Sequence, residues 1–174
     1  MIGALAAAFA AVLLASSARA GEVCSYDASL CFSAPDNAVA ADPGAFKGGA
    51  VPLLALKDNA GSKAITDDLI FLLTREGPGS AQAVAQTGLR ALRANVGAKP
   101  MFHPDAACSQ TPLRKDLTGY YYGNGCPPLK NCTPMRFLYF SFGGRVLKAA
   151  CPPSRFNECR KILGSIRTAK KNAR

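Results

Sequence analysis

One segment constrains the fold more than any other: the run M-R-F-L-Y-F-S-F at Met135–Phe142. Large apolar and aromatic residues at this density predict a β-strand. Gly143-Gly144 follows and predicts a two-residue hairpin loop, from which residues 145–151 return as a second strand. Apolar side chains alternate onto both faces of the first strand: Phe137 and Tyr139 on one, and Leu138, Phe140 and Phe142 on the other. We therefore expect this strand near the centre of a sheet that is covered on both sides.

Two helices are predicted to supply that cover. Ser80 can cap a helix that runs to residue 96 and stops at Gly97. Its expected apolar face consists of Ala81, Val84, Ala85, Gly88, Leu92 and Val96. Pro152-Pro153 introduces a second helix, for which Ser154 is the expected cap. Its apolar stripe consists of Phe156, Cys159, Leu163 and Ile166.

Shorter apolar runs predict the remaining strands. They lie at residues 30–32, 51–57, 66–74 and within 113–122, where Gly123-Asn124-Gly125 is expected to end the last one. A short helix stays open as the alternative for residues 66–74. Together these elements predict the α+β class: an antiparallel sheet with two amphipathic helices packed on it, stabilised by disulfides. We expect a single domain over residues 21–169, followed by a basic tail at residues 170–174.

The N-terminus has the pattern of a signal peptide at residues 1–20. An apolar run at residues 2–15 is followed by Ala18-Arg19-Ala20, with small residues where signal peptidase needs them, so cleavage is expected before Gly21. An uncleaved anchor stays open as the alternative, because no Lys or Arg precedes the run. No comparably long apolar stretch follows, so we expect no membrane span after removal of the signal. The expected location is periplasmic or secreted.

The chain contains 7 cysteines, all of which follow the expected cleavage point. An exported chain meets an oxidising environment, which favours disulfides; zinc sites favour close C-x2-C pairs, which are absent here, and the chain has 1 histidine. No metal and no cofactor are therefore expected. The disulfide candidates are Cys24, Cys31, Cys108, Cys126, Cys132 and Cys151, with local closures between the first two and within the other four. Cys159 is either a buried free thiol or the partner of Cys151. The odd cysteine is a small buried residue, a nucleophile or an intermolecular link.

Charge is divided unevenly along the chain. Residues 21–88 carry 4 basic and 8 acidic residues, whereas residues 89–174 carry 16 basic and 3 acidic ones. A basic surface attracts polyanions, and its candidate binding residues are Arg155, Arg160, Lys161, Arg167, Lys170 and Lys171. Outside the cytoplasm the expected partner is a protein or an anionic envelope component, and nucleic acid is not favoured. The alternative is a solvated face without a partner.

Residues for catalysis are sparse. The motifs G-x-S-x-G, H-E-x-x-H and S-x-x-K are absent. His103 with Cys108 is a conceivable dyad, and Asp67-Asp68 is a carboxylate pair whose side chains would point to opposite faces of a strand. We therefore expect a non-enzymatic binding or accessory protein. The alternatives are a small secreted enzyme that uses His103 or an unpaired cysteine, and a structural surface protein. The sequence leaves the oligomeric state open.

The order of these elements resembles the PsbP/DcrB-like α/β sandwich family. The resemblance rests on residues 30–35, on residues 69–96, and on residues 136–166 with their F-x-x-C-x-x-x-L-x-x-I ending. The chain departs from that family in carrying additional cysteines and in having Asp36-Asn37-Ala38 in place of a tryptophan after the hairpin proline. The resemblance implies a binding, assembly or immunity role without shared catalytic residues.

Overall fold

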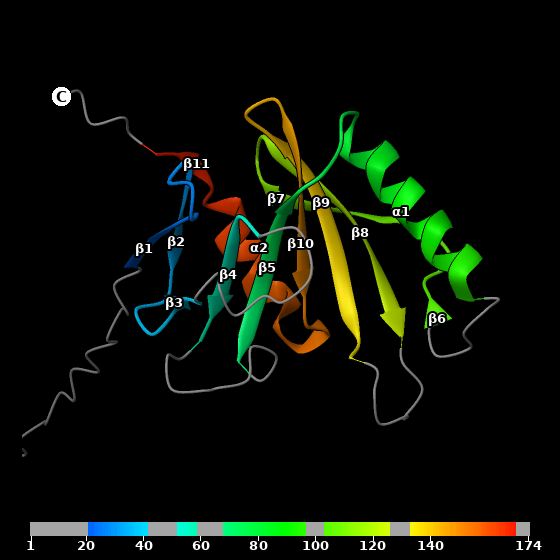
Figure 1. Ribbon diagram of the computed structural model, residues 1–174, viewed down its shortest axis with the longest axis horizontal. Helices are drawn as coiled ribbons and strands as arrows, with labels where there is room; N and C mark the ends of the chain where they lie inside the picture. Colours follow the sequence, from blue (N-terminus) through cyan, green and yellow to red (C-terminus); the bar gives the residue numbers. More distant parts are fainter. Residues whose placement is uncertain (1–20, 42–51, 59–67, 97–102, 126–132, 170–174) are drawn as a thin grey trace, which may run out of the picture.

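The computed structural model describes residues 21–41, 52–58, 68–96, 103–125 and 133–169 (Figure 1). The larger sheet has eight strands and begins in the order β3 (Val39–Ala40), β4 (Leu54–Lys57), β5 (Leu69–Arg75), β10 (Arg145–Cys151), β9 (Met135–Phe142) and β8 (Leu117–Gly125). It ends on β6 (His103–Pro104) and β7 (Ser109–Arg114), which pair with different halves of β8. The smaller sheet has the order β1 (Gly21–Cys24), β2 (Leu30–Ala34), β11 (Arg167–Thr168). All these pairs are antiparallel.

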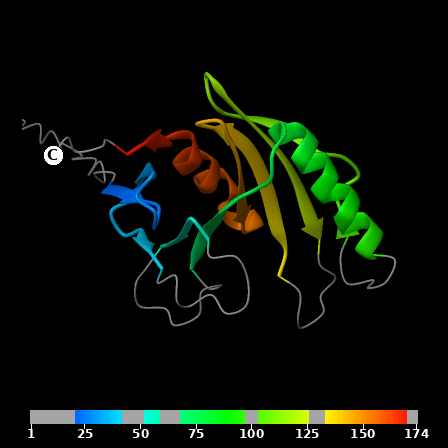
Figure 2. The ribbon, with the colours of Figure 1, turned by 45° about the horizontal axis from the view of Figure 1, so that its top comes forward.

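The two helices lie on opposite faces of the large sheet (Figure 2). Helix α1 (Ala81–Val96) packs on β8 and β9, and α2 (Phe156–Gly164) lies behind the strands in Figure 1, against β7, β5 and β2. A short 3-10 turn, η2 (Pro153–Arg155), leads into α2. The predicted α+β class, with an antiparallel sheet, two amphipathic helices and disulfides, is confirmed.

The β9–β10 hairpin has the predicted bounds and the predicted central position. Gly143 and Gly144 form its loop with φ of 58° and 72°, in the left-handed region that glycine adopts without strain. Leu138 and Phe140 are fully buried in the core on the α2 side, whereas Tyr139 is buried under α1. The two apolar faces of this strand therefore belong to two separate hydrophobic clusters.

Residues 113–122 depart from the prediction of a single strand. They contain the end of β7 and the start of β8, which turn at Lys115-Asp116 without a glycine or proline to signal it. Strand β8 also continues through Gly123, because β9 pairs with it on one side and Asp105 bonds its backbone on the other. Backbone pairing with neighbours, which a local pattern does not reveal, decides both boundaries.

The predicted cap of α1 is confirmed, whereas the predicted cap of α2 is wrong. Ser80 accepts a hydrogen bond from the Ala83 backbone N–H at 3.2 Å, so it caps α1 as predicted. Ser154 does not cap α2: it lies inside η2, and the residue before the helix is Arg155, without a side-chain cap. The expected stripe of α2 is buried throughout: Phe156, Cys159, Leu163 and Ile166.

The predictions for the two ends of the chain concern residues that the structure does not describe. The expected signal peptide at residues 1–20 and the basic tail at residues 170–174 both lie outside the described residues. Within the described ranges, no helix combines the length and the apolar character that crossing a membrane requires.

Candidate functional site

The described cysteines form two disulfides. Cys24 is joined to Cys31 across the β1–β2 hairpin, and Cys151 at the end of β10 is joined to Cys159 on α2. Cys159 is therefore the partner of Cys151, although it was not among the primary candidates. Cys108 was a candidate but is unpaired in the structure, and it packs half-buried against the cluster beneath α1. Cys126 and Cys132 lie outside the described residues.

Two of the predicted anion-binding residues are already neutralised within the protein. Arg155 forms ion pairs with Asp58 at 3.0 Å and with Glu158 at 2.7 Å, and Arg167 pairs with Glu22. The hydrogen bond from Arg155 lowers the pKa of Asp58 below its ordinary value. These two arginines therefore link the N-terminal part of the chain to its C-terminal part through ion pairs. Lys170 and Lys171 lie outside the described residues.

The remaining predicted cations, Arg160 and Lys161, belong to a group that the sequence did not identify. We call this group the basic end; its members are Arg114, Lys115, Arg145, Arg160 and Lys161. It lies where the β7–β8 and β9–β10 turns meet the C-terminal half of α2 (Figure 1).

Arg114 fixes the position of this group. Its guanidinium donates hydrogen bonds to the backbone oxygens of Ile166 at 2.7 Å and of Gly164 at 3.4 Å, which satisfies carbonyl groups at the end of α2. The same guanidinium lies 5.7 Å from the centre of the Phe142 ring. Arg145 is the register partner of Phe142 across the hairpin. Both arginines therefore flank Phe142, one from each turn.

The other members extend the positive charge along α2 and the β7 edge. Arg160 donates to the backbone oxygen of Pro112 at 3.4 Å, and exposed Lys161 follows it on the helix. Lys115 is exposed in the β7–β8 turn beside Asp116, whose carboxylate pairs with Arg114 at 2.7 Å. Among the ion pairs of the described residues, Asp116 is the carboxylate that engages this group. Lys115, Arg145 and Lys161 are exposed, whereas Arg114 and Arg160 are half-buried.

A hollow of about 350 Å³ adjoins the basic end. It lies between the start of α1 and β8, and its lining includes Ser80, Asp116, Tyr120 and Ser141. The first turn of α1 contains no acidic residue, and the Asp116 carboxylate in the lining of the hollow is the negative charge near the positive end of the helix dipole.

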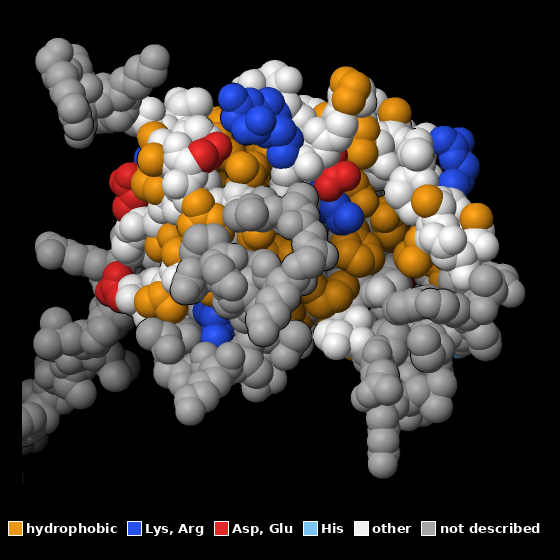
Figure 3. Space-filling model, in the orientation of Figure 1, with side chains coloured by type: hydrophobic (Ala, Val, Ile, Leu, Met, Phe, Trp, Pro, Cys, Tyr) orange, Lys and Arg blue, Asp and Glu red, His pale blue; other side chains and the backbone are white. Residues whose placement is uncertain are grey.

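The face opposite α2 has a different character. Figure 3 shows apolar side chains over the sheet beside α1, with most of the visible acidic side chains on the side of the small sheet. Beneath α1, the hydroxyl groups of Tyr122 and Tyr139 lie 2.9 Å apart in a buried hydrogen bond; we call these residues the tyrosine pair. Burial raises the pKa of both hydroxyl groups.

Cys108 and His103, the conceivable catalytic dyad, both lie within the described residues. Burial and the nearby Asp105 carboxylate raise the pKa of the Cys108 thiol, which makes the reactive thiolate scarcer at neutral pH. His103 is exposed on β6, and in the described ranges no hydrogen bond joins it to Cys108. Asp67 lies outside the described residues, whereas Asp68 lies just before β5.

Sequence patterns missed Arg114, Lys115 and Arg145 for a simple reason. Each residue lies at or beside a strand end, where only the three-dimensional meeting of two turns brings it close to α2. The uneven charge along the chain gave the excess of basic residues, but it contained no information on which cations would find carboxylate partners.

Comparison with solved structures places the fold beside PsbP. The chain is similar to the solution structure of cyanobacterial PsbP (CyanoP) from Synechocystis sp. PCC 6803, with a TM-score of 0.51 and 10% identity over 87% of this chain and 93% of that one. A crystal structure from Bacteroides thetaiotaomicron VPI-5482 matches 88% of this chain and 50% of its own length at 10% identity and a TM-score of 0.39, too low to carry an argument. No family model and no curated protein matches the sequence. The weak resemblance to the PsbP-like sandwich is confirmed as a likeness of fold.

Proposed function

We propose that this chain is an exported accessory protein that binds an anionic partner through the basic end and catalyses no reaction. The observation that carries the proposal is the gathering of five cations from two turns and α2, of which only Arg114 has a carboxylate partner among the described ion pairs. Such a surface raises the local concentration of a negatively charged ligand. The partner is an anionic envelope component or an acidic protein.

Export is part of the same proposal. Two disulfides among the described residues fit an oxidising compartment better than a reducing cytosol. Residues 1–20 have the pattern of a signal peptide, which would direct the chain to export. Mass measurement of the mature protein tests this part: we expect a chain that starts at Gly21 and contains intact disulfides, and recovery of a fully reduced chain from the cytosol would contradict it.

The binding surface is tested with two charge-reversal variants of equal net charge. Arg145→Glu with Lys161→Glu changes the basic end, whereas Arg90→Glu with Arg93→Glu changes exposed arginines of α1. Vesicles of phosphatidylcholine with roughly one third phosphatidylglycerol serve as the envelope probe. An immobilised acidic polypeptide serves as the protein probe.

The expected result is a loss of binding that depends on position. The basic-end variant should bind one of the two probes on the order of tenfold more weakly than the unaltered chain, and the α1 variant should change little. Binding should also weaken between about 0.01 M and about 0.15 M salt, because the screening length then falls from about 30 Å to about 8 Å. Equal losses in both variants, or binding that is indifferent to salt, would show that this end of the molecule is not the binding site.

The alkylation rate of the Cys108 thiol distinguishes the binding proposal from the alternative of a small secreted enzyme. With its raised pKa, Cys108 should be alkylated more slowly than a free cysteine at neutral pH. Faster alkylation that disappears in His103→Ala would support an activated thiol and would replace the binding proposal with a catalytic one.

A further inference from the structure

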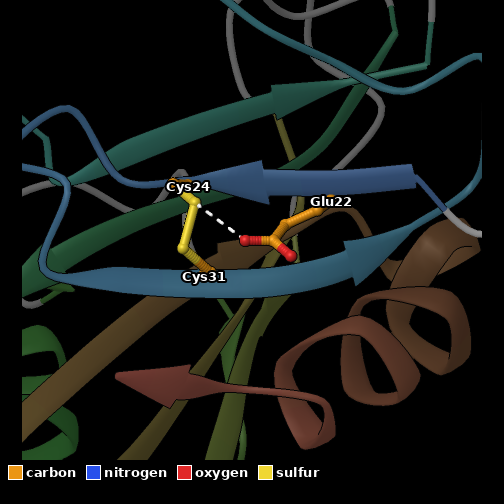
Figure 4. Close-up of side chains that lie close together, drawn as sticks. All are labelled: Glu22, Cys24 and Cys31. Carbon is orange, nitrogen blue, oxygen red and sulfur yellow. Dashed lines mark hydrogen bonds between the residues drawn. A yellow bond between two sulfur atoms is a disulfide. The ribbon is translucent and has the colours of Figure 1, made fainter. Parts of the chain in front are cut away.

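A second group of chemically capable side chains lies on the β1–β2 hairpin, away from the basic end. Glu22, Cys24 and Cys31 place a carboxylate oxygen and two sulfur atoms within 4.8 Å of one another (Figure 4). In the structure the two sulfurs form a disulfide. The group ranges from exposed Glu22 through half-buried Cys24 to buried Cys31, so it is open to solvent on one side only.

The hairpin register brings the three side chains to one face. Cys24 and Cys31 are directly opposite one another, with Cα atoms 4.0 Å apart. Glu22 precedes Cys24 by two residues and therefore points to the same side of the strand. Its Oε1 atom lies 3.6 Å from the Cys24 Sγ atom, a contact rather than a hydrogen bond while that sulfur is in a disulfide and has no proton to donate.

Arg167 orients the carboxylate. Its guanidinium pairs with Oε2 of Glu22, which leaves Oε1 directed at the sulfur atoms. Carboxylates that bind metals are commonly held in this way by a hydrogen-bond donor on the oxygen that does not face the metal. Arg167 belongs to β11 and is the register partner of Cys31, so the same small sheet supplies both the ligands and this support.

We propose that the dithiol form of this hairpin binds Zn²⁺ through Cys24, Cys31 and Glu22, with a fourth position open to water. A dithiol reductant opens the disulfide by giving two electrons and two protons, which produces two thiols; Zn²⁺ then displaces both protons and binds two thiolates. In a tetrahedral site with Zn–S bonds of about 2.3 Å, the sulfurs are roughly 3.7 Å apart. Rotation of two side chains on opposite strands can reach that separation. Thiolate ligands favour zinc over calcium or magnesium.

The disulfide and the metal use the same sulfur atoms and therefore exclude one another. A disulfide oxidant takes two electrons from the two thiolates, forms the Cys24–Cys31 bond and releases Zn²⁺. The chain thus has a metal-binding form before oxidation or under reducing conditions, and a metal-free form with the bond seen in the structure.

The test uses the full mature chain, reduced with a phosphine and titrated with Zn²⁺ against a chromophoric chelator. Glu22→Gln keeps every thiol and removes one proposed ligand, whereas Cys24→Ser with Cys31→Ser removes the other two. The controls are Glu158→Gln, a carboxylate paired with Arg155 elsewhere, and Cys108→Ser, a thiol beneath α1. Substitution of Co²⁺ for Zn²⁺ gives a thiolate charge-transfer band that reports sulfur ligands directly.

We expect Glu22→Gln to weaken the tightest site by at least about tenfold and the double serine variant to remove that site and its cobalt band. The two controls should keep the affinity of the unaltered chain. Circular dichroism on each reduced variant identifies any loss of fold. The proposal is overturned if the double serine variant binds as tightly as the unaltered reduced chain, or if Glu22→Gln has no effect.

Discussion

Gly88 is the position where one added methyl group should reveal how α1 packs on the sheet. A Cβ atom at Gly88 would lie 2.6 Å from the Tyr122 hydroxyl oxygen and 2.8 Å from that of Tyr139, both closer than real contacts allow. The nearest ring atom, Cζ of Tyr122, would lie at 3.5 Å, an ordinary contact distance. The clash of Gly88→Ala is therefore with the two hydroxyl groups of the tyrosine pair and not with their rings.

The expected change in the free energy of unfolding for Gly88→Ala combines one stabilising and two destabilising contributions. Alanine favours the helix interior over glycine by about 1 kcal/mol. Overpacking costs about 1–3 kcal/mol, and disruption of the buried hydroxyl–hydroxyl bond costs about 1 kcal/mol more. Gly88→Ala should thus lower the free energy of unfolding by about 1–3 kcal/mol in the unaltered chain. With both tyrosines changed to phenylalanine, the same substitution should raise it by up to about 1 kcal/mol, because only the helix preference remains.

Urea unfolding of the oxidised mature chain, followed by circular dichroism, measures all four members of this cycle. The Tyr122→Phe, Tyr139→Phe variant should itself be close to the unaltered chain, because both partners of the hydrogen bond leave together. The decisive result is a change of sign for Gly88→Ala between the two backgrounds. Equal destabilisation in both, or none in the unaltered chain, would refute the packing that we describe.

Three further predictions concern stability and charge. Burial raises the pKa of both hydroxyl groups of the tyrosine pair, so as pH rises the unfolded chain loses these protons first, near pH 10. The urea concentration at the unfolding midpoint should therefore stay constant below about pH 10 and fall above it. This fall should be smaller in the Tyr122→Phe, Tyr139→Phe variant. The pKa of Asp58 is lowered chiefly by its hydrogen bond with Arg155. Asp58 therefore contributes to the free energy of unfolding at pH values above the ordinary carboxyl pKa, and this contribution is lost as pH falls through the lowered pKa of the folded chain. Arg155→Ala should raise the Asp58 pKa in an NMR titration. Gly164→Ala would place Cβ 2.3 Å from the Leu113 carbonyl oxygen and should cost about 2 kcal/mol or more in urea unfolding, whereas Gly77→Ala, with nothing within 4 Å, should not.

The sequence predicted the parts of the fold that local patterns determine. Met135–Phe142, its two-glycine loop and the returning strand appear with the expected bounds, because alternation, side-chain size and turn chemistry agree there. The cap at Ser80 has the same kind of local cause. Leu89 shows the limit of such reasoning: it is 5% exposed and belongs to the cluster beneath α1, but it was absent from the expected apolar face of that helix.

Features that depend on pairing between distant segments were not predictable in this way. The strands β1, β3, β6 and β11 are short and exist because neighbouring strands provide hydrogen-bond partners. The disulfide between Cys151 and Cys159 was one of two open readings, since a helix stripe identifies a buried cysteine without saying what it touches. The basic end likewise required the two turns to be placed in space.

Ion pairs between the acidic and the basic half of the chain explain part of its uneven charge. Glu22 and Asp58, from the acidic N-terminal half, pair with Arg167 and Arg155 of the basic half across 145 and 97 residues. Each exposed or half-exposed pair is worth up to about 1 kcal/mol, so the two halves attract one another as the chain closes. Part of the positive charge therefore serves the fold itself. The basic end gathers cations such as Arg145 and Lys161 for which the described residues show no carboxylate partner, and we therefore propose binding there rather than over the C-terminal half as a whole.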